Sequence, residues 1–377
     1  MTTMNPTVRA IRGTLMLVTT VLFALAGPAT AQEQREVEVP VDCSAGDDLS
    51  DAVSVATPDT VLMLTGTCEG PVTITQDRVT LDGQGDAVIR VPEDASGPVV
   101  HVDGVRDARL TGLTVEGGQH GILAEKMATV ELRDVTSHDN ESHGVEVINA
   151  FVDADGLHAH DNGRVGINVN RTSEVRLRNA VLENNGISGI ISFNGAIVRL
   201  EERNVIRSNG AQGFTLGMNG MLFTIGAELV VDGNGAEGIL LQQSGHAQFL
   251  GGDLQVRGNG SDGIAADFGS TLALGIDAFQ VPGSVVTENN GGAGLLVDRG
   301  AIVAVESIMA VTASGNAGPG LSVNDGAQAT VAESTFTGND GAGIEVAFGG
   351  RLTVTGGEHD SMACEGVVHV RGDVACP

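Results

Sequence analysis

Short runs of alternating apolar and polar residues recur along most of this chain, and polar bends separate them. In one example the alternation covers residues 129–132, continues over 135–137 and resumes over 144–147. Alternation with a period of two is typical of a strand with one buried face. We therefore expect three short strands in each repeat. The residues expected on the buried face of this repeat are Val130, Leu132, Val135, Val145 and Val147.

The bends carry a recurring phrase, in which an Asn and three further residues precede a Gly and then an aliphatic residue or Phe. The phrase occurs nine times, with spacings of 22 to 26 residues and one of 31. Such a period indicates a solenoid of stacked repeats. With three strands per turn, it predicts an all-β, single-domain parallel β-helix of about ten or more coils. The asparagines are Asn140, Asn162, Asn185, Asn209, Asn234, Asn259, Asn290, Asn316 and Asn339.

Equivalent positions of successive coils should lie one strand spacing apart, about 4.7–4.9 Å. The repeated Asn should therefore bond its amide to the equivalent Asn one coil away, and we expect it to adopt the left-handed backbone conformation that Asn tolerates. The apolar residue after each Gly should form a continuous buried column. Its members are Ile122, Val145, Ile167, Ile190, Phe214, Ile239, Ile264, Leu295, Leu321 and Ile344.

The two ends of the chain differ from the repeats. Residues 1–31 have the pattern of a bacterial-type signal peptide, with two arginines, an apolar run over 14–26 and a small-x-small cleavage site. We therefore expect a secreted or periplasmic protein without a membrane span after cleavage. An open solenoid end needs a cap. We expect an N-terminal cap over 32–60 with an amphipathic helix near 47–56, the β-helix over 61–360 and a C-terminal cap over 361–377.

The four cysteines lie in two pairs near the predicted ends. Four cysteines allow three connectivities. Two local disulfides, Cys43–Cys68 and Cys364–Cys376, suit a solenoid whose ends lie far apart. A zinc site is the alternative, but neither a CxxC pair nor suitably spaced histidines support it.

Composition restricts the partners. The formal net charge is −28, and such a surface repels nucleic acid and anionic membranes. We expect a monomer. The sequence requires no cofactor and is compatible with calcium.

Residues 48–85, with a helical stretch, a strand, Gly-Thr-Cys and further strands, resemble the start of pectin-lyase-like proteins. The Asn-x-x-x-Gly-Ile phrases are similar to the right-handed parallel β-helix repeat of that superfamily. The resemblance implies a right-handed β-helix and makes polysaccharide the leading ligand class. Of the catalytic signatures in that superfamily, only a partial Gly-His-Gly appears, as residues 142–144. We therefore expect non-catalytic binding, with a lyase, epimerase or hydrolase acting on uronate-containing glycans as the alternative.

Histidines gather in the early coils. His120 and His143 share the position before the repeat Gly. His138 and His160 share the position six before it, and each is followed by an aspartate. Stacked coils would place these groups at one turn, where they could ligate a metal or transfer protons. The alternative is that these residues recur only because neighbouring repeats share ancestry, without forming a functional site. The candidate metal ligands are His120, His138, Asp139, His160 and Asp161, and His143 is also a catalytic candidate.

Charged residues form two outward columns on the strand that precedes that turn. In pectin-lyase-like enzymes this face carries the substrate groove. Carboxylates between guanidiniums could supply an acid or base beside a clamp for a uronate, whereas the alternative is cross-strand charge pairing. The first column contains Glu131, Asp153 and Arg176, and the second contains Arg133, Asp155 and Arg178. The chain has no Trp or Tyr to stack on sugar rings, and only Phe151 and Phe193 lie near these columns.

Overall fold

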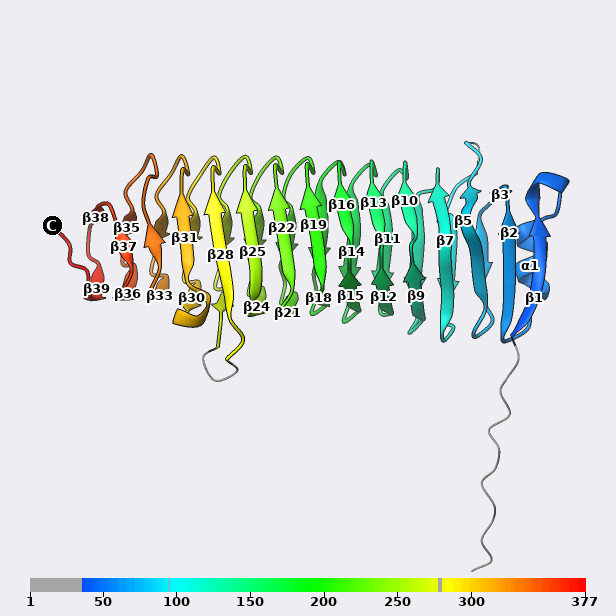
Figure 1. The fold of residues 1–377 in the computed structure, drawn as a ribbon, viewed down its shortest axis with the longest axis horizontal. Coiled ribbons are helices and arrows are strands. Elements are labelled where there is room, and N and C mark those ends of the chain that lie inside the picture. Colours follow the sequence, from blue (N-terminus) through cyan, green and yellow to red (C-terminus); the bar gives the residue numbers. More distant parts are fainter. Residues whose placement is uncertain (1–35, 94, 277–279) are drawn as a thin grey trace, which may run out of the picture. The chain divides into compact units, whose positions relative to one another are not determined.

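Most coils contain three strands, as the alternation predicts. In one coil β9 (Thr129–Arg133) leads to β10 (Thr136–His138), and β11 (His143–Ile148) follows the bend that carries Asn140. Each strand pairs in parallel with its counterpart in the next coil, as β9 does with β12. The computed structural model describes residues 36–93, 95–276 and 280–377. The predicted signal peptide, residues 1–31, lies outside this range. Glu36–Pro377 form one compact unit, an elongated stack of coils (Figure 1).

The strands stack in three columns, with β5 and β7 contributing to both of the first two. The first strands are β1 (Val37–Asp42), β2 (Thr60–Thr65), β5 (Thr80–Arg90), β7 (Ala108–Glu116), β9, β12 (Phe151–Asp155), β15 (Glu174–Arg178), β18 (Ile197–Glu201), β21 (Met221–Ile225), β24 (His246–Leu250), β27 (Thr271–Leu274), β30 (Ile302–Val305), β33 (Gln328–Ala332), β36 (Arg351–Thr355) and β39 (His369–Gly372). We call the outward side of this column the first-strand face.

The other two columns complete each coil. The second strands are β3 (Thr67–Glu69), β10, β13 (His158–His160), β16 (Val181–Glu183), β19 (Arg203–Arg207), β22 (Glu228–Asp232), β25 (Gly252–Arg257), β28 (Gly283–Glu288), β31 (Val311–Ser314), β34 (Thr335–Phe336) and β37 (Glu358–His359). The third strands form a separate 13-stranded sheet. They are β4 (Val72–Ile74), β6 (Val100–Asp103), β8 (His120–Glu125), β11, β14 (Val165–Asn170), β17 (Ser188–Ser192), β20 (Phe214–Leu216), β23 (Ile239–Leu241), β26 (Ile264–Ala266), β29 (Leu295–Val297), β32 (Leu321–Val323), β35 (Ile344–Ala347) and β38 (Met362–Glu365).

The repeated asparagines form the predicted ladder. Asn209, for example, donates from Nδ2 to Oδ1 of Asn234 at 2.9 Å, and its backbone N–H donates to the same oxygen at 3.1 Å. The repeat Gly makes room for this contact, because a Cβ on Gly213 would lie 2.8 Å from Asn234 Nδ2 and 2.7 Å from the carbonyl oxygen of Gly238. The phrase Asn-x-x-x-Gly thus encodes both the hydrogen bond and the space beside it.

The expected left-handed conformation of the ladder asparagines is wrong by one residue. Positive φ occurs at the residue before each ladder Asn, such as Asp139 at 51° and Ser208 at 55°. The chain turns at that preceding residue, so the Asn itself can direct its amide along the stack. Asp, Asn, Ser and Gly occupy the turning position, and of these Asp, Asn and Gly tolerate a left-handed backbone well.

The core is the predicted apolar column together with the inward residues of the other strands. The predicted column members are 0–1% exposed, Phe214 and Ile239 among them. Helix α1 (Leu49–Val55) is capped by Asp48, whose side chain accepts from the backbone N–H of Asp51, and the helix buries Leu49 and Val53. Short 3₁₀ turns lie at Cys43–Ala45 and Ser307–Met309. No helix among the described residues is long and apolar enough to cross a bilayer.

Both segments predicted as caps also contribute strands. β1 pairs with β2, while β38 and β39 extend the stack beyond β35 and β36. The predicted disulfides Cys43–Cys68 and Cys364–Cys376 are both formed, and the described residues contain no free cysteine. Each disulfide therefore closes a local loop at one end of the solenoid.

Candidate functional site

The two predicted charged columns lie on the first-strand face in the expected register. Asp153 pairs across strands with Glu131 on one side and Arg176 on the other, and Asp155 pairs likewise with Arg133 and Arg178. Alternation within each short strand directs these side chains outward while Val152 and Ala154 are buried. The six predicted residues thus form one patch, which we call the charged strip.

Asp153 is the centre of the charged strip. Three guanidinium groups approach its carboxylate: Arg133 at 3.4 Å, Arg176 at 3.6 Å, and Arg178 in a direct hydrogen bond. Arg178 is 17% exposed and also bonds Glu201 at 3.3 Å. Burial disfavours its charged form, but Asp153, Glu201 and Asp155 outweigh burial and raise the pKa of Arg178. Its positive charge is therefore fixed, which suits an electrostatic clamp.

Two adjoining hollows border the charged strip at Phe151. One, of about 250 Å³, is lined by Arg109, Glu131, Arg133 and Asp153 among others. The other, of about 280 Å³, includes Met127, and Phe151 and Thr129 line both. Phe151 therefore separates a charged hollow from a more apolar one.

A third, smaller hollow of about 120 Å³ lies further along the same face, beside Phe223. The Arg199 guanidinium lies 5.5 Å from the centre of the Phe223 ring. The Phe193 predicted near the strip instead follows β17, on the third-strand side of the coil.

The histidines of the second strands are held by carboxylates of their own chain. His138 and His160 stack with ring centres 4.8 Å apart, as their shared repeat position predicts. Nδ1 of each ring lies 2.7 Å from Oδ2 of the following aspartate, Asp139 or Asp161. His138 Nε2 also lies 3.2 Å from Glu116. These carboxylates come from the adjacent bend and the preceding coil. The arrangement therefore favours local pairing between neighbouring residues over a metal site.

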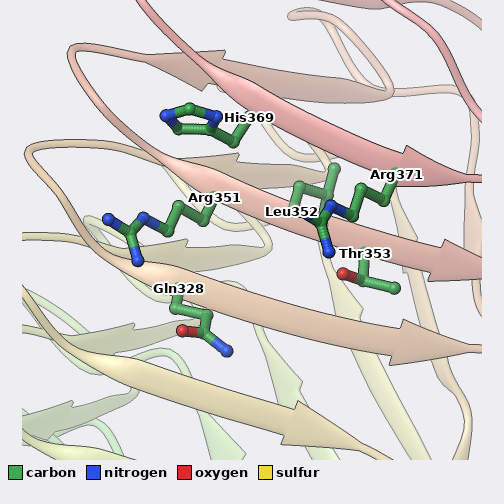
Figure 2. Close-up of a pocket in the computed structure, with 6 residues that line it drawn as sticks. All are labelled: Gln328, Arg351, Leu352, Thr353, His369 and Arg371. Carbon is green, nitrogen blue, oxygen red and sulfur yellow. The ribbon is translucent and has the colours of Figure 1, made fainter.

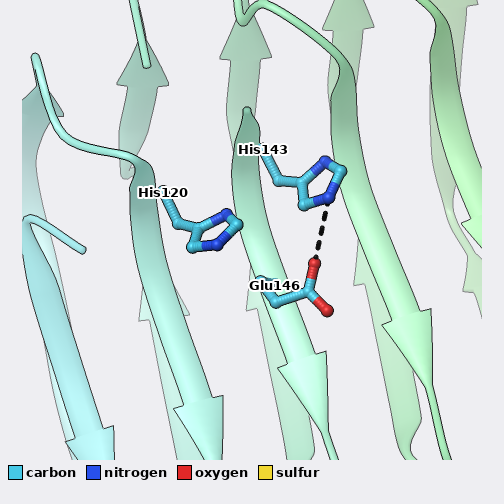
Figure 3. Close-up of side chains that lie close together, drawn as sticks. All are labelled: His120, His143 and Glu146. Atoms are coloured by element: carbon cyan, nitrogen blue, oxygen red, sulfur yellow. Dashed lines mark ion pairs between the residues drawn. The ribbon is translucent and has the colours of Figure 1, made fainter. Parts of the chain in front are cut away.

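His120 and His143 form a second stack, at the start of the third strands, with ring centres 5.2 Å apart. His143 Nε2 lies 3.3 Å from Oε2 of Glu146, and Figure 3 shows both imidazoles next to that carboxylate. Asn168 donates from Nδ2 to the same oxygen at 2.8 Å. His143 and Glu146 are only 7% and 6% exposed. The Nδ1 atoms of both histidines are buried without a partner among the described residues.

Burial sets the protonation of His143 and Glu146, the two buried members of this group. Desolvation, with smaller contributions from His120 and Arg164, lowers the pKa of His143 to about 3. Desolvation also raises the pKa of Glu146 above its ordinary value, although Asn168 and Arg164 oppose that shift. His143 is therefore neutral near pH 7. A neutral imidazole can coordinate a metal or accept a proton.

The predicted single histidine site divides into separate groups. Two sets of potential ligand atoms within 4.8 Å of one another contain the predicted histidines: His120 with His143 and Glu146, and His138 with Glu116 and Asp139. No such group in the described part of the chain joins the two stacks or includes His160 and Asp161. The first set, with two imidazoles and one carboxylate, has the ligands that suit a divalent transition metal. The positive charge of the nearby Arg164, however, opposes the binding of a cation there.

Comparison with known proteins identifies the fold. Residues 98–271 match the family model described as the right handed beta helix region. The chain has the right-handed parallel β-helix fold. The predicted fold class and the resemblance to right-handed β-helix repeat proteins are thereby confirmed. No curated protein sequence matches the chain.

Similar solved structures include the A-module of the mannuronan C-5 epimerase AlgE6 of Azotobacter vinelandii, at 16% identity and a TM-score of 0.48 over 87% of this chain and 93% of that one. The pectate lyase Pel9A is 15% identical with a TM-score of 0.42, over 74% of this chain and 78% of that one. A family 28 exopolygalacturonase of Yersinia enterocolitica is 12% identical with a TM-score of 0.41, over 88% and 78%. At these values the likeness is one of fold and assigns no activity to this β-helix.

Sequence reasoning did not find Glu146 or Asn168. Alternation places both on the outward side of the third strands, where a polar residue is ordinary, and they pair across β11 and β14. The signal that could have found them is a carboxylate three residues after a repeated histidine, next to an Asn in the following coil. Glu146 is buried and Asn168 half-buried, and alternation within one strand does not describe how neighbouring coils cover a side chain.

Proposed function

We propose that this β-helix binds an acidic, uronate-containing polysaccharide along its first-strand face and acts on it as a lyase, epimerase or hydrolase. The observation that carries the proposal is the convergence of Arg133, Arg176 and Arg178 on Asp153, beside the two hollows at Phe151. The hollows offer an aromatic edge and apolar surface for a sugar ring, and the guanidiniums offer bidentate partners for a uronate carboxylate.

The roles follow from charge. Arg176 and Arg178 would stabilise the negative charge that grows on a uronate carboxylate when the neighbouring carbon loses its proton. That step is shared by elimination and epimerisation. Glu131 or Asp153 would accept the proton, since both carboxylates lie in this patch and contact Arg133. Asp155, which accepts from Asn179 at 2.9 Å, would hold Arg178 in place. The two disulfides fit a site of action outside the cytoplasm.

Non-catalytic binding of the same polysaccharide is the second candidate. The observation that favours it is that the three acidic groups of the charged strip, Glu131, Asp153 and Asp155, and the neighbouring Glu201 are each already within an ion pair. The oxygens of the Asp153 carboxylate already contact three guanidiniums, so fewer of its lone pairs are free to accept a proton from a substrate. A binder would use the strip through its arginines alone.

The test is an assay of the purified protein on a panel of acidic polysaccharides, with and without calcium. Ultraviolet absorbance of unsaturated ends reports a lyase, new reducing ends without that absorbance report a hydrolase, and exchange of carbon-bound hydrogen with solvent reports an epimerase. Binding without any of these products supports the second candidate. Neither binding nor turnover of any acidic polysaccharide would reject both.

A further inference from the structure

A hollow of about 340 Å³ lies on the first-strand face near the C-terminal end of the solenoid. It is lined by Gln328, Arg351, Leu352, Thr353, His369 and Arg371, from β33, β36 and β39 (Figure 2). In the figure the side chains of Arg351 and Arg371 lie on either side of the space above Gln328 and Thr353. The lining is therefore basic and polar, with one apolar residue at its floor.

Parallel pairing brings the basic groups together. Arg351 pairs across strands with His369, and Thr353 pairs with Arg371. Gln328 lies beside Arg351 on the other side. With strands about 4.7–4.9 Å apart, two guanidiniums and an imidazole reach the same hollow. Arg351, His369 and Arg371 are all exposed.

The arginines of this hollow differ from those of the charged strip in having no acidic partner among the described residues. Across the described parts of the chain, no ion pair is formed by Arg351, His369 or Arg371, whereas every arginine of the strip contacts at least one carboxylate. Like charges side by side on neighbouring strands are destabilising. The chain has 48 acidic residues against 20 Lys and Arg, yet neither guanidinium of this hollow is in an ion pair with any residue that the structure describes. An anion from outside would supply the missing charge.

We propose that this hollow binds an oxyanion, a carboxylate or a sulfate, carried by a polysaccharide that lies along the first-strand face. Arg351 and Arg371 would each offer a planar pair of N–H donors to the anion. Gln328 and Thr353 would hydrogen-bond a neighbouring sugar hydroxyl. The identity of the polymer rests on the proposed function, while the anion site rests on the unpaired cations and the hollow.

The position of the hollow sets a length requirement. β12, which carries Asp153, and β36, which carries Arg351, are eight coil steps apart. At the strand spacing this is about 38 Å. Only a long chain can therefore contact the charged strip and the hollow together. Such a chain would gain affinity from the second contact, because that contact forms within one complex.

The test compares Arg351→Gln/Arg371→Gln with the wild type by calorimetric titration of the whole protein. The ligands are long polygalacturonate, a galacturonate trimer too short to span, and dextran sulfate, with inorganic sulfate as a competitor. Arg203→Gln is the matched control, because Arg203 is 57% exposed but paired with Glu228 on the second strands. Unchanged melting temperatures would show that all variants fold.

We expect the double variant to bind the long chains about tenfold more weakly, while the control stays within about twofold. The polygalacturonate and dextran sulfate arms show whether carboxylate or sulfate is preferred. If the wild type binds long chains and the double variant binds them equally well, this inference is wrong and the proposed function stands. If the wild type binds no acidic chain, both are wrong.

Discussion

Asn209 and Asn234, in adjacent coils and both buried, share a 2.9 Å amide hydrogen bond along the solenoid axis. The Oδ1 of Asn209 also accepts from the backbone and side chain of Asn185, at 3.0 and 2.9 Å. Each ladder asparagine therefore satisfies buried donors of the preceding coil as well as its own. Loss of one member leaves several polar groups unpaired in a place that water does not reach.

Asn209→Ala should lower the free energy of unfolding by about 1–3 kcal/mol, because the donors of Asn185 lose their acceptor. Urea denaturation measures this loss. Asn170→Ala is the control, since Asn170 is an asparagine outside the ladder whose Oδ1 accepts from Asn194 Nδ2 at 2.8 Å. Equal midpoints for Asn209→Ala and the wild type would contradict the account of the ladder. Ile239→Asp, which places a charge in the apolar column, should prevent folding altogether.

Reduction or replacement of the disulfides should destabilise the two ends separately. Cys364→Ser/Cys376→Ser should cost about 2–4 kcal/mol and expose β38 and β39 first, because that loop holds the last coil. Hydrogen exchange measured peptide by peptide would show early exchange confined to residues 358–377. Uniform loss of protection along the solenoid would contradict local closure. Peptide mapping without reductant should recover both disulfides.

Stability should fall in acid through His143. Its pKa is 6.5 in the unfolded chain and about 3 in the folded one. The unfolded state therefore binds more protons over that window, and stability is lost as the pH falls from about 6.5 toward 3, by at most about 1.4 kcal/mol per pH unit. The lowered pKa of His120 acts in the same direction. The raised pKa of Glu146 acts in the opposite direction, because the stability that it contributes to the folded protein is present at low pH and is lost as the pH rises.

The measurement is the urea midpoint against pH for the wild type, His143→Gln and Glu146→Gln. The wild type should lose its advantage over His143→Gln as the pH falls through this window. Glu146→Gln should steepen the acid dependence, since it removes the opposing group. A difference between wild type and His143→Gln that does not change with pH would mean that the imidazole is not buried and neutral.

Metal content tests the group of His120, His143 and Glu146 directly. Because Arg164 opposes a cation there, we expect purified protein to contain background zinc, copper and manganese. Elemental analysis of wild type and His143→Gln after dialysis against these ions should give equal values. Stoichiometric metal in the wild type that disappears in His143→Gln would establish a His120, His143 and Glu146 site instead.

The fold was predictable because the Asn and Gly positions mark the same bend in each coil. Once those are aligned, the register of Asp153 with Glu131 and Arg176 follows without further information. The alignment does not reach β36 and β39, since the phrase ends at Gly343 and the last coil lacks it. The pairing of Arg351 with His369, and so the basic hollow, could not be found that way. Glu146 was missed because its burial comes from other coils.

The rate of turnover by Arg178→Gln tests the central claim most directly. Arg178 lies within the charged strip, and its replacement by a neutral residue removes the clamp that the proposed reaction needs. On the acidic polysaccharide that the wild type processes, kcat/KM should fall by about a hundredfold or more, while Arg203→Gln keeps the wild-type value and both variants keep their melting temperatures. Full activity in a folded Arg178→Gln would contradict the assignment of the first-strand face as the site.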